Sequence, residues 1–215
     1  MKKYLLAIDP GSRKFGFAVF SFENGDQHEL IEFGTVVISK PTKQCATTSI
    51  YERLRLIGEF VETICCKYSI DEFAIEEAFL GKNTDSTIKM SMARGAFICT
   101  ISKATLNVYE YPATKVKQIG ALNAKATKDD VISTIKMIYS LRDITEDAAD
   151  AVAIGRTHLI LRHGALSRAH QLFTTGVTSG AFRRTSTSRG SSRRSTATSR
   201  DAMEKALLAK GLIKA

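Results

Sequence analysis

The hydrophobic pattern of the first forty residues is that of strands rather than helices. Residues 4–8 form a short apolar run that ends at the turn sequence Asp9-Pro10-Gly11-Ser12, which is typical of a buried strand followed by a turn. Residues 15–22 and 30–38 are rich in β-branched and aromatic residues, and Asn24-Gly25-Asp26 lies between them. The pattern therefore predicts a three-stranded antiparallel meander.

From Ser49 onward the apolar period changes to that of a helix. Leu54, Ile57, Val61 and Ile64 recur at helical spacing, which predicts an amphipathic helix to about residue 68. The same reasoning predicts strands at 71–76 and 107–110 and helices at 86–103, 114–119, 128–140 and 147–162. This order favours the α/β class, with a five-stranded mixed sheet flanked by helices in a domain of residues 1–163.

The last quarter of the chain differs in composition from the rest. Residues 174–200 contain 14 Ser or Thr and six Arg among 27 residues, so almost nothing apolar is available for a core. Residues 164–215 carry a net charge of +8, against +1 for residues 1–163. We expect a disordered basic tail, with a short terminal helix at 201–210, that attracts a polyanion such as nucleic acid.

Two further features limit the classes of protein to consider. No signal peptide and no apolar run of about 18 residues is present, which predicts a cytoplasmic location, shared with nucleic acid. The four cysteines lack a metal-ligand spacing and are expected to be buried or half-buried free thiols.

Four carboxylates are the candidate catalytic and metal-binding groups. Asp9 and Glu76 each follow a predicted buried strand, where a side chain points into the ligand-binding crevice of an open α/β sheet. Taken alone, Asp9 is better explained as a turn residue that caps its own loop, and Glu76 is equally well explained as a surface acid at a strand end. Asp147 and Asp150 lie three apart on an Ala-rich helix and therefore share a face. Acids so placed repel each other unless a cation lies between them, although an acidic first turn can also complement the helix dipole.

A site of carboxylates without His or Cys favours a hard cation. Such ligands suit Mg²⁺, with Mn²⁺ as a substitute, rather than Zn²⁺. Two ions about 3.5–4 Å apart can activate water and stabilise the leaving oxygen of a phosphodiester. We therefore predict a metal-dependent phosphodiesterase with two Mg²⁺ ions.

Several short motifs, in order, resemble the RuvC family of Holliday junction resolvases. They are Ile8-Asp9-Pro10-Gly11-Ser12-Arg13, Phe73-Ala74-Ile75-Glu76-Glu77-Ala78-Phe79, Lys82-Asn83, Ala93-Arg94-Gly95, Val116-Lys117-Gln118 and Asp147-Ala148-Ala149-Asp150-Ala151. The resemblance covers about residues 3–162. It implies an RNase H-like fold and a homodimer that nicks four-way DNA junctions with Mg²⁺, in DNA recombination and repair, with branch-migration proteins as possible partners.

The resemblance also implies roles for individual residues. Asp9, Glu76, Asp147 and Asp150 match the metal-binding acids, whereas Glu77 falls at a position that is not a ligand. Lys128 matches a basic catalytic residue near the scissile phosphate, and Phe79 an aromatic that stacks at the junction centre. The DNA-contact residues implied in this way are Arg13, Phe79, Lys82, Asn83, Arg94, Lys117 and Lys128.

The sequence departs from the family pattern in two places, and other functions stay open. Residues 120–127 replace a Gly-rich stretch, and the Ser/Arg-rich tail has no counterpart, which is compatible with a viral source. The alternatives are an RNase H-like nuclease for other branched DNA or RNA–DNA hybrids and a non-enzymatic DNA-binding architectural protein. A sugar-kinase-like ATPase is disfavoured, because no second Asp-x-Gly phosphate loop is present.

Overall fold

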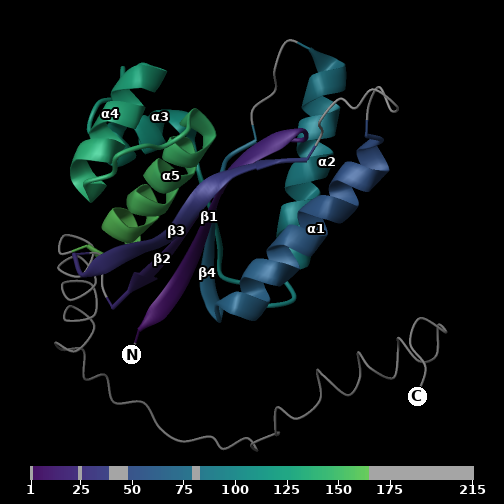
Figure 1. The fold of residues 1–215 in the computed structure, drawn as a ribbon, viewed down its shortest axis with the longest axis horizontal. Helices are drawn as coiled ribbons and strands as arrows, with labels where there is room; N and C mark the ends of the chain where they lie inside the picture. Colours follow the sequence, from purple (N-terminus) through teal and green to yellow (C-terminus); the bar gives the residue numbers. More distant parts are fainter. Residues whose placement is uncertain (1, 24–25, 39–47, 79–82, 165–215) are drawn as a thin grey trace, which may run out of the picture. The chain divides into compact units, whose positions relative to one another are not determined.

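The fold is a single mixed sheet with helices on both faces. A computed structural model describes residues 2–23, 26–38, 48–78 and 83–164. The strands lie in the order β3-β2-β1-β4-β5 (Figure 1). Their bounds are β1 Lys3–Asp9, β2 Lys14–Phe22, β3 His28–Val37, β4 Ile70–Glu76 and β5 Val108–Tyr111.

The strand pairing agrees with the predicted meander. β1 pairs with β2, and β2 with β3, in antiparallel fashion, while β4 and β5 are added in parallel on the other side of β1. Parallel neighbours need crossover connections, and the helix α1 (Ile50–Lys67) supplies the one between β3 and β4. The first two residues of the predicted turn, Asn24 and Gly25, lie outside the described residues.

The helices begin close to the predicted residues, and their caps explain the differences. The remaining helices are α2 (Thr84–Ile101), α3 (Ala113–Lys115), α4 (Lys128–Tyr139) and α5 (Glu146–His163). α2 begins two residues before the predicted start, because the Asn83 side chain accepts a hydrogen bond from the Ser86 amide at 3.1 Å. α3 continues into a π-helical turn, η1 (Val116–Gly120), where one short helix was predicted.

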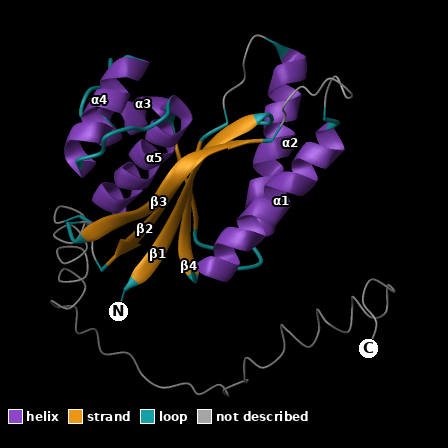
Figure 2. Cartoon of the chain, in the orientation of Figure 1, coloured by secondary structure: helices purple, strands orange, loops and turns teal. Residues whose placement is uncertain are grey.

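Side-chain alternation along the central strands divides the core into two layers. Leu5 and Ala7 belong to the cluster that packs against α5, whereas Leu6 and Ile8 belong to the cluster that packs against α1 and α2. Figure 2 shows α1 and α2 on one side of the strands, with α3, α4 and α5 on the other. Because side chains alternate along a strand, each residue of β1 and β4, including the last one, faces one of these two layers.

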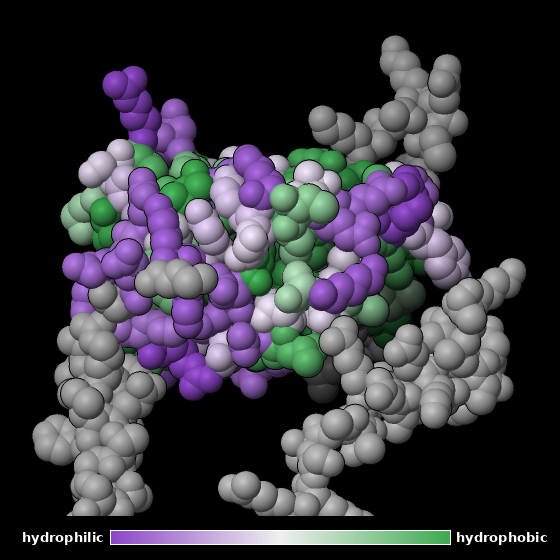
Figure 3. All heavy atoms as spheres, turned by 90° about the horizontal axis from the view of Figure 1, so that it is seen from below, coloured by the Kyte–Doolittle hydropathy of each residue, from purple (hydrophilic) through white to green (hydrophobic). Residues whose placement is uncertain are grey.

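The structure confirms the predicted α/β class with a five-stranded mixed sheet. The last described helix ends at His163, the predicted limit of the domain, and the tail and terminal helix lie outside the described residues. None of the helices in the described part of the chain is long and apolar enough to cross a membrane. In Figure 3, hydrophilic side chains cover much of the left part of this face and also its upper right, and hydrophobic atoms are visible between these two areas.

Candidate active site

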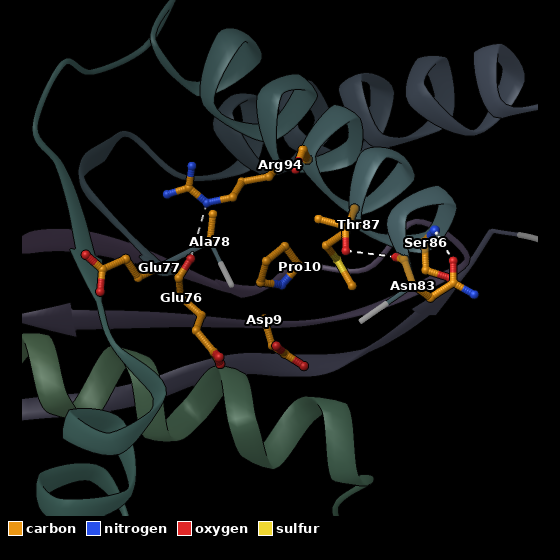
Figure 4. A pocket seen from close by; sticks show the side chains of 11 residues that line it. Asp9, Pro10, Glu76, Glu77, Ala78, Asn83, Ser86, Thr87 and Arg94 are labelled. Carbon is orange, nitrogen blue, oxygen red and sulfur yellow. Dashed lines mark hydrogen bonds between the residues drawn. The ribbon is translucent and has the colours of Figure 1, made fainter. Parts of the chain in front are cut away.

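The ends of β1 and β4 and the start of α5 bring the four predicted acids together. Ala7 and Ala74 both face the α5 layer, so two residues further on Asp9 and Glu76 face it as well. Figure 4 shows both carboxylates directed toward the α5 ribbon, while Glu77 points elsewhere. Asp147 and Asp150 lie in the first turns of that helix. The alternation thus explains why Glu76, and not its neighbour, joins the site.

Burial, together with repulsion between neighbouring acids, raises the pKa values of three of the four carboxyl groups. Burial raises the pKa of Asp9 to about 8, with further contributions from Asp150, Glu76 and Asp147. Burial is also the main cause that raises the pKa of Asp150 to about 6 and that raises the pKa of Glu76. Carboxyl groups held this close, and withdrawn from water, need positive charge in order to ionise together.

Lysines at the edge of the site provide part of this positive charge. Lys128 and Lys117 lower the pKa of Asp150, and Lys128 lowers that of Asp9. Lys14 Nζ lies 2.9 Å from Asp147 Oδ2, and Lys128 forms an ion pair with Glu146. Sequence reasoning missed Lys14 as a member of the site. Lys14 follows Arg13 at the start of β2, and Gly16 of the same strand pairs with Asp9. This position close to a predicted site residue is the signal that could have identified Lys14.

Two adjoining hollows open at the acids. One, of about 410 Å³, lies on the α2 side and is lined by Asp9 and Glu76 together with Asn83 and Arg94. The other, of about 680 Å³, is lined by five acids, Asp9, Asp85, Glu146, Asp147 and Asp150, and by the basic side chains Arg13, Lys14, Lys89 and Lys128. Because Asp9 lines both, the acids lie where the two hollows meet. Positive charge on the rim of the second hollow suits a phosphate backbone.

Two of the predicted DNA contacts also have structural partners. Arg94 Nε donates to the Glu76 carbonyl oxygen at 3.3 Å (Figure 4), and Arg94 Nη2 lies 2.7 Å from Glu110 Oε2. Asn83 caps α2. Arg94 therefore holds the end of β4, and with it Glu76, in addition to the DNA contact predicted for it. Phe79 and Lys82 lie outside the described residues.

The donor set fits a hard divalent cation. All four acids offer carboxylate oxygens, the ligands that Mg²⁺ and Mn²⁺ prefer, and their mutual repulsion is what such a cation would relieve. No cysteine in the described part of the chain lines either hollow. The expectation of buried or half-buried thiols is correct for Cys65 but wrong for Cys66 and Cys99, which are exposed on the outer faces of α1 and α2.

The raised pKa of Asp9 predicts a pH dependence of stability in the absence of metal. Between pH 4 and pH 8 the folded protein keeps a proton that the unfolded chain has released, so the free energy of unfolding falls as pH rises. We expect the Tm measured in EDTA to decrease toward pH 8 and excess Mg²⁺ to restore it.

The variant Asp9→Asn is the control for this measurement. Burial lowers the pKa of His158, so below pH 6.5 this group makes the free energy of unfolding rise with pH, in the opposite direction to Asp9. His158 is present in both proteins, so its contribution cancels in their difference. We therefore expect the difference between the wild-type and Asp9→Asn profiles to grow toward pH 8. Parallel profiles between pH 6 and pH 8 would contradict the proposed burial of a repelled carboxyl at Asp9.

Comparison with known proteins points to one family. A sequence profile described as "Crossover junction endodeoxyribonuclease RuvC" matches residues 5–158. Proteins of that name from Idiomarina loihiensis and Edwardsiella ictaluri are 37% and 36% identical over 155 and 163 residues. These alignments cover 72% and 75% of the chain, and 85% and 90% of the two relatives.

Solved structures agree with the sequence matches. Thermus thermophilus RuvC in complex with a Holliday junction substrate superposes with a TM-score of 0.62 at 26% identity, covering 73% of this chain and 92% of the other. The yeast mitochondrial Holliday junction resolvase, at 14% identity and a TM-score of 0.59 over 80% of this chain and 83% of its own, shares the fold.

Proposed function

Because the chain belongs to the RuvC family of crossover junction endodeoxyribonucleases, we propose that it resolves four-way DNA junctions by paired, metal-dependent nicks. The observation that carries the proposal is the meeting of four acids at hollows whose lining also includes Arg13, Lys14, Lys89 and Lys128. An acid quartet of this kind is costly in a protein that only binds DNA, since its carboxylates would repel the phosphates. The architectural alternative is therefore disfavoured.

We assign metal binding to Asp9, Glu76, Asp147 and Asp150. Two Mg²⁺ ions, with Mn²⁺ as a substitute, would supply Lewis acidity and charge neutralisation at the scissile phosphate. Asp9 lines both hollows and is the acid whose pKa all three of the others raise, so we propose that it would be a ligand shared by both ions. Asp147 forms an ion pair with Lys14, and a cation held by the acids would compete with Lys14 for this carboxylate.

The basic side chains of the second hollow have a separate part in the proposal. Lys128 is exposed and reaches across to Glu146 at the start of α5, so its ammonium group lies at the edge of the acids. We propose that it releases Glu146 and contacts the phosphate to be cleaved, and that Lys117 neutralises a neighbouring charge. Arg13 extends this basic rim, Phe79 is proposed to stack at the junction centre, and Lys82 is proposed to contact DNA.

Paired nicks require two active sites. We propose a homodimer in which each subunit carries one acid quartet, and branch-migration proteins as further partners. The Thermus relative whose complex with a Holliday junction is known supports junction DNA as the ligand.

The deciding experiment is cleavage of a synthetic four-way junction. The full chain is incubated with the junction and, in parallel, with duplex, flap and RNA–DNA hybrid substrates, each with Mg²⁺ and with EDTA. We expect symmetric nicks in the junction alone, only with Mg²⁺, and ends that a ligase seals. Equal cleavage of the hybrid or flap would favour the broader nuclease alternative, and no cleavage of any substrate would refute the enzyme.

The basic tail gives a further prediction. Deleting residues 174–215 removes nine basic residues and two acidic ones. Each lost phosphate contact lowers the salt dependence of log K by about 0.9 on duplex DNA, so junction binding should weaken most at low salt while Mg²⁺-dependent nicking persists. Replacing the six Arg of residues 174–200 by Lys is the control, and should retain affinity. Unchanged affinity of the deletion variant at both low and high salt would contradict a role for the tail in binding.

A further inference from the structure

A second polar cluster lies at the opposite ends of the two elements that carry three of the four acids. Glu72 lies near the start of β4, on the same strand face as Glu76, and His158 and His163 lie near the end of α5. The Nε2 atoms of the two imidazoles are 2.6 Å and 2.9 Å from a single Glu72 oxygen, Oε2. The three possible ligand atoms all lie within 4.8 Å of one another. The proposed nuclease reaction uses none of these residues.

The cluster is largely buried and contains one carboxylate. Glu72 is 6% exposed and His158 is completely buried. Burial opposes the charge of Glu72, but hydrogen bonds to His158 and His163 outweigh it and lower the pKa of Glu72 to about 2. Burial lowers the pKa of His158, so at neutral pH its ring is uncharged beside an ionised carboxylate. Arg162 lies over the ring of Tyr109, with Cζ 4.3 Å from the ring centroid, and its charge contributes to the lowered pKa of His158.

The orientation of the His158 ring suits a ligand. Its Nδ1 lies 2.9 Å from the Tyr111 hydroxyl, which fixes the ring and leaves Nε2 directed at Glu72. Imidazoles that bind metals almost always have the second ring nitrogen held in this way. When the Tyr111 hydroxyl donates to Nδ1, Nε2–H donates to Glu72; a cation bound at Nε2 would replace that proton, and Nδ1–H would then donate to Tyr111.

We propose that Glu72, His158 and His163 form a second metal site, for a transition-metal dication such as Zn²⁺. Two imidazoles and one carboxylate are an established zinc donor set, whereas Mg²⁺ prefers oxygen ligands alone. The side chain of His163 is 24% exposed, so it is the member of the cluster that solvent reaches most easily. A bound ion joins the end of α5 to β4 and thereby stabilises the frame that holds Asp147, Asp150 and Glu76.

Zinc titration of the full chain tests the site. The protein is stripped with a chelator and titrated with ZnCl2 against a chromophoric competitor, in excess Mg²⁺ that occupies the acid quartet. We expect one tight Zn²⁺ per chain and an increase in Tm. His163→Gln, at the half-exposed end of α5, should weaken Zn²⁺ binding at least about tenfold and lose the increase in Tm.

His28→Gln is the matched control. His28 bonds to the Tyr139 hydroxyl at 3.0 Å and does not belong to the cluster, so this variant should keep the wild-type affinity. The cysteines are the same in the wild type, His163→Gln and His28→Gln, so any Zn²⁺ bound by cysteine contributes equally to the three titrations and cancels when they are compared. Equal Zn²⁺ affinity in the wild type and His163→Gln would overturn the proposal and leave the cluster as hydrogen bonds alone.

A second measurement does not depend on the folding of a variant. The chain has four histidines, and NMR resolves their ring protons. Zn²⁺ should shift the resonances of two of them, His158 and His163, and leave that of His28 unchanged. No shift at one equivalent of Zn²⁺, or a shift of the His28 resonance instead, would overturn the proposal independently of nuclease activity.

Discussion

Asp9→Asn is expected to bind four-way junctions with wild-type affinity and to lose cleavage almost completely. The amide has the shape of the carboxylate but cannot serve as an anionic ligand to two cations. Loss of several kcal/mol of transition-state stabilisation corresponds to a rate decrease of about a thousandfold or more. The first-turnover rate on a synthetic junction in Mg²⁺ and a binding isotherm in EDTA measure the two quantities separately.

The stability of the same variant provides an independent check. Asp9 is a buried carboxyl that three neighbouring acids repel, so its replacement should leave the Tm in EDTA unchanged or raise it. The matched control is Asp143→Asn, because the side chain of Asp143 is fully exposed and takes no part in the site. We expect wild-type cleavage from the control. A variant Asp9→Asn that nicks at the normal rate would refute the assignment of the quartet.

Much of the site could be predicted from the sequence because alternation and helical periodicity are local properties. Asp9 follows the strand of residues 4–8, and Asp147 and Asp150 share a helix face, so their directions follow from the chain itself. The strand order β3-β2-β1-β4-β5 then brings the ends of β1 and β4 side by side. The choice of Glu76 over Glu77 came from the family resemblance, and the structure supplies its physical reason in the facing of Ala74.

The ion pairs of the site could not be predicted in the same way. Lys14 and Asp147 are 133 residues apart, and Lys128 and Glu146 lie on different helices. No local period links such pairs, since they depend on how α4 and α5 pack onto the sheet. The same is true of Arg94, whose partners Glu76 and Glu110 lie on two strands of the sheet. The family motif identified Arg94 as a predicted DNA contact, but its hydrogen bond to the end of β4 could be seen only in the tertiary structure.

The close approach of α5 to β2 was also invisible in the sequence, although it decides where Asp147 lies. Gly16 pairs with Asp9 across the sheet, and the first turn of α5 passes directly over it. A Cβ atom built on Gly16 would lie 1.7 Å from the Asp147 carbonyl oxygen and 2.3 Å from its carbonyl carbon. Because both are backbone atoms, no side-chain rotation can remove the overlap.

Gly16→Ala is therefore expected to displace the start of α5 and to separate Asp147 and Asp150 from Asp9 and Glu76. A misplacement of about 1 Å in a catalytic group lowers rates by about a hundredfold, so we expect cleavage to fall by at least that factor. The overlap should also destabilise the fold by about 1–3 kcal/mol. Mg²⁺ should give a smaller increase in Tm than in the wild type, while junction binding persists.

Gly95→Ala is the matched control for Gly16→Ala. Gly95 lies within α2, and nothing approaches within 4 Å of the position that a Cβ atom would take. Alanine is the better helix former by about 1 kcal/mol, so this variant should be slightly more stable and fully active. Wild-type cleavage by Gly16→Ala, with an unchanged increase in Tm on adding Mg²⁺, would show that the acids do not depend on this contact between α5 and β2.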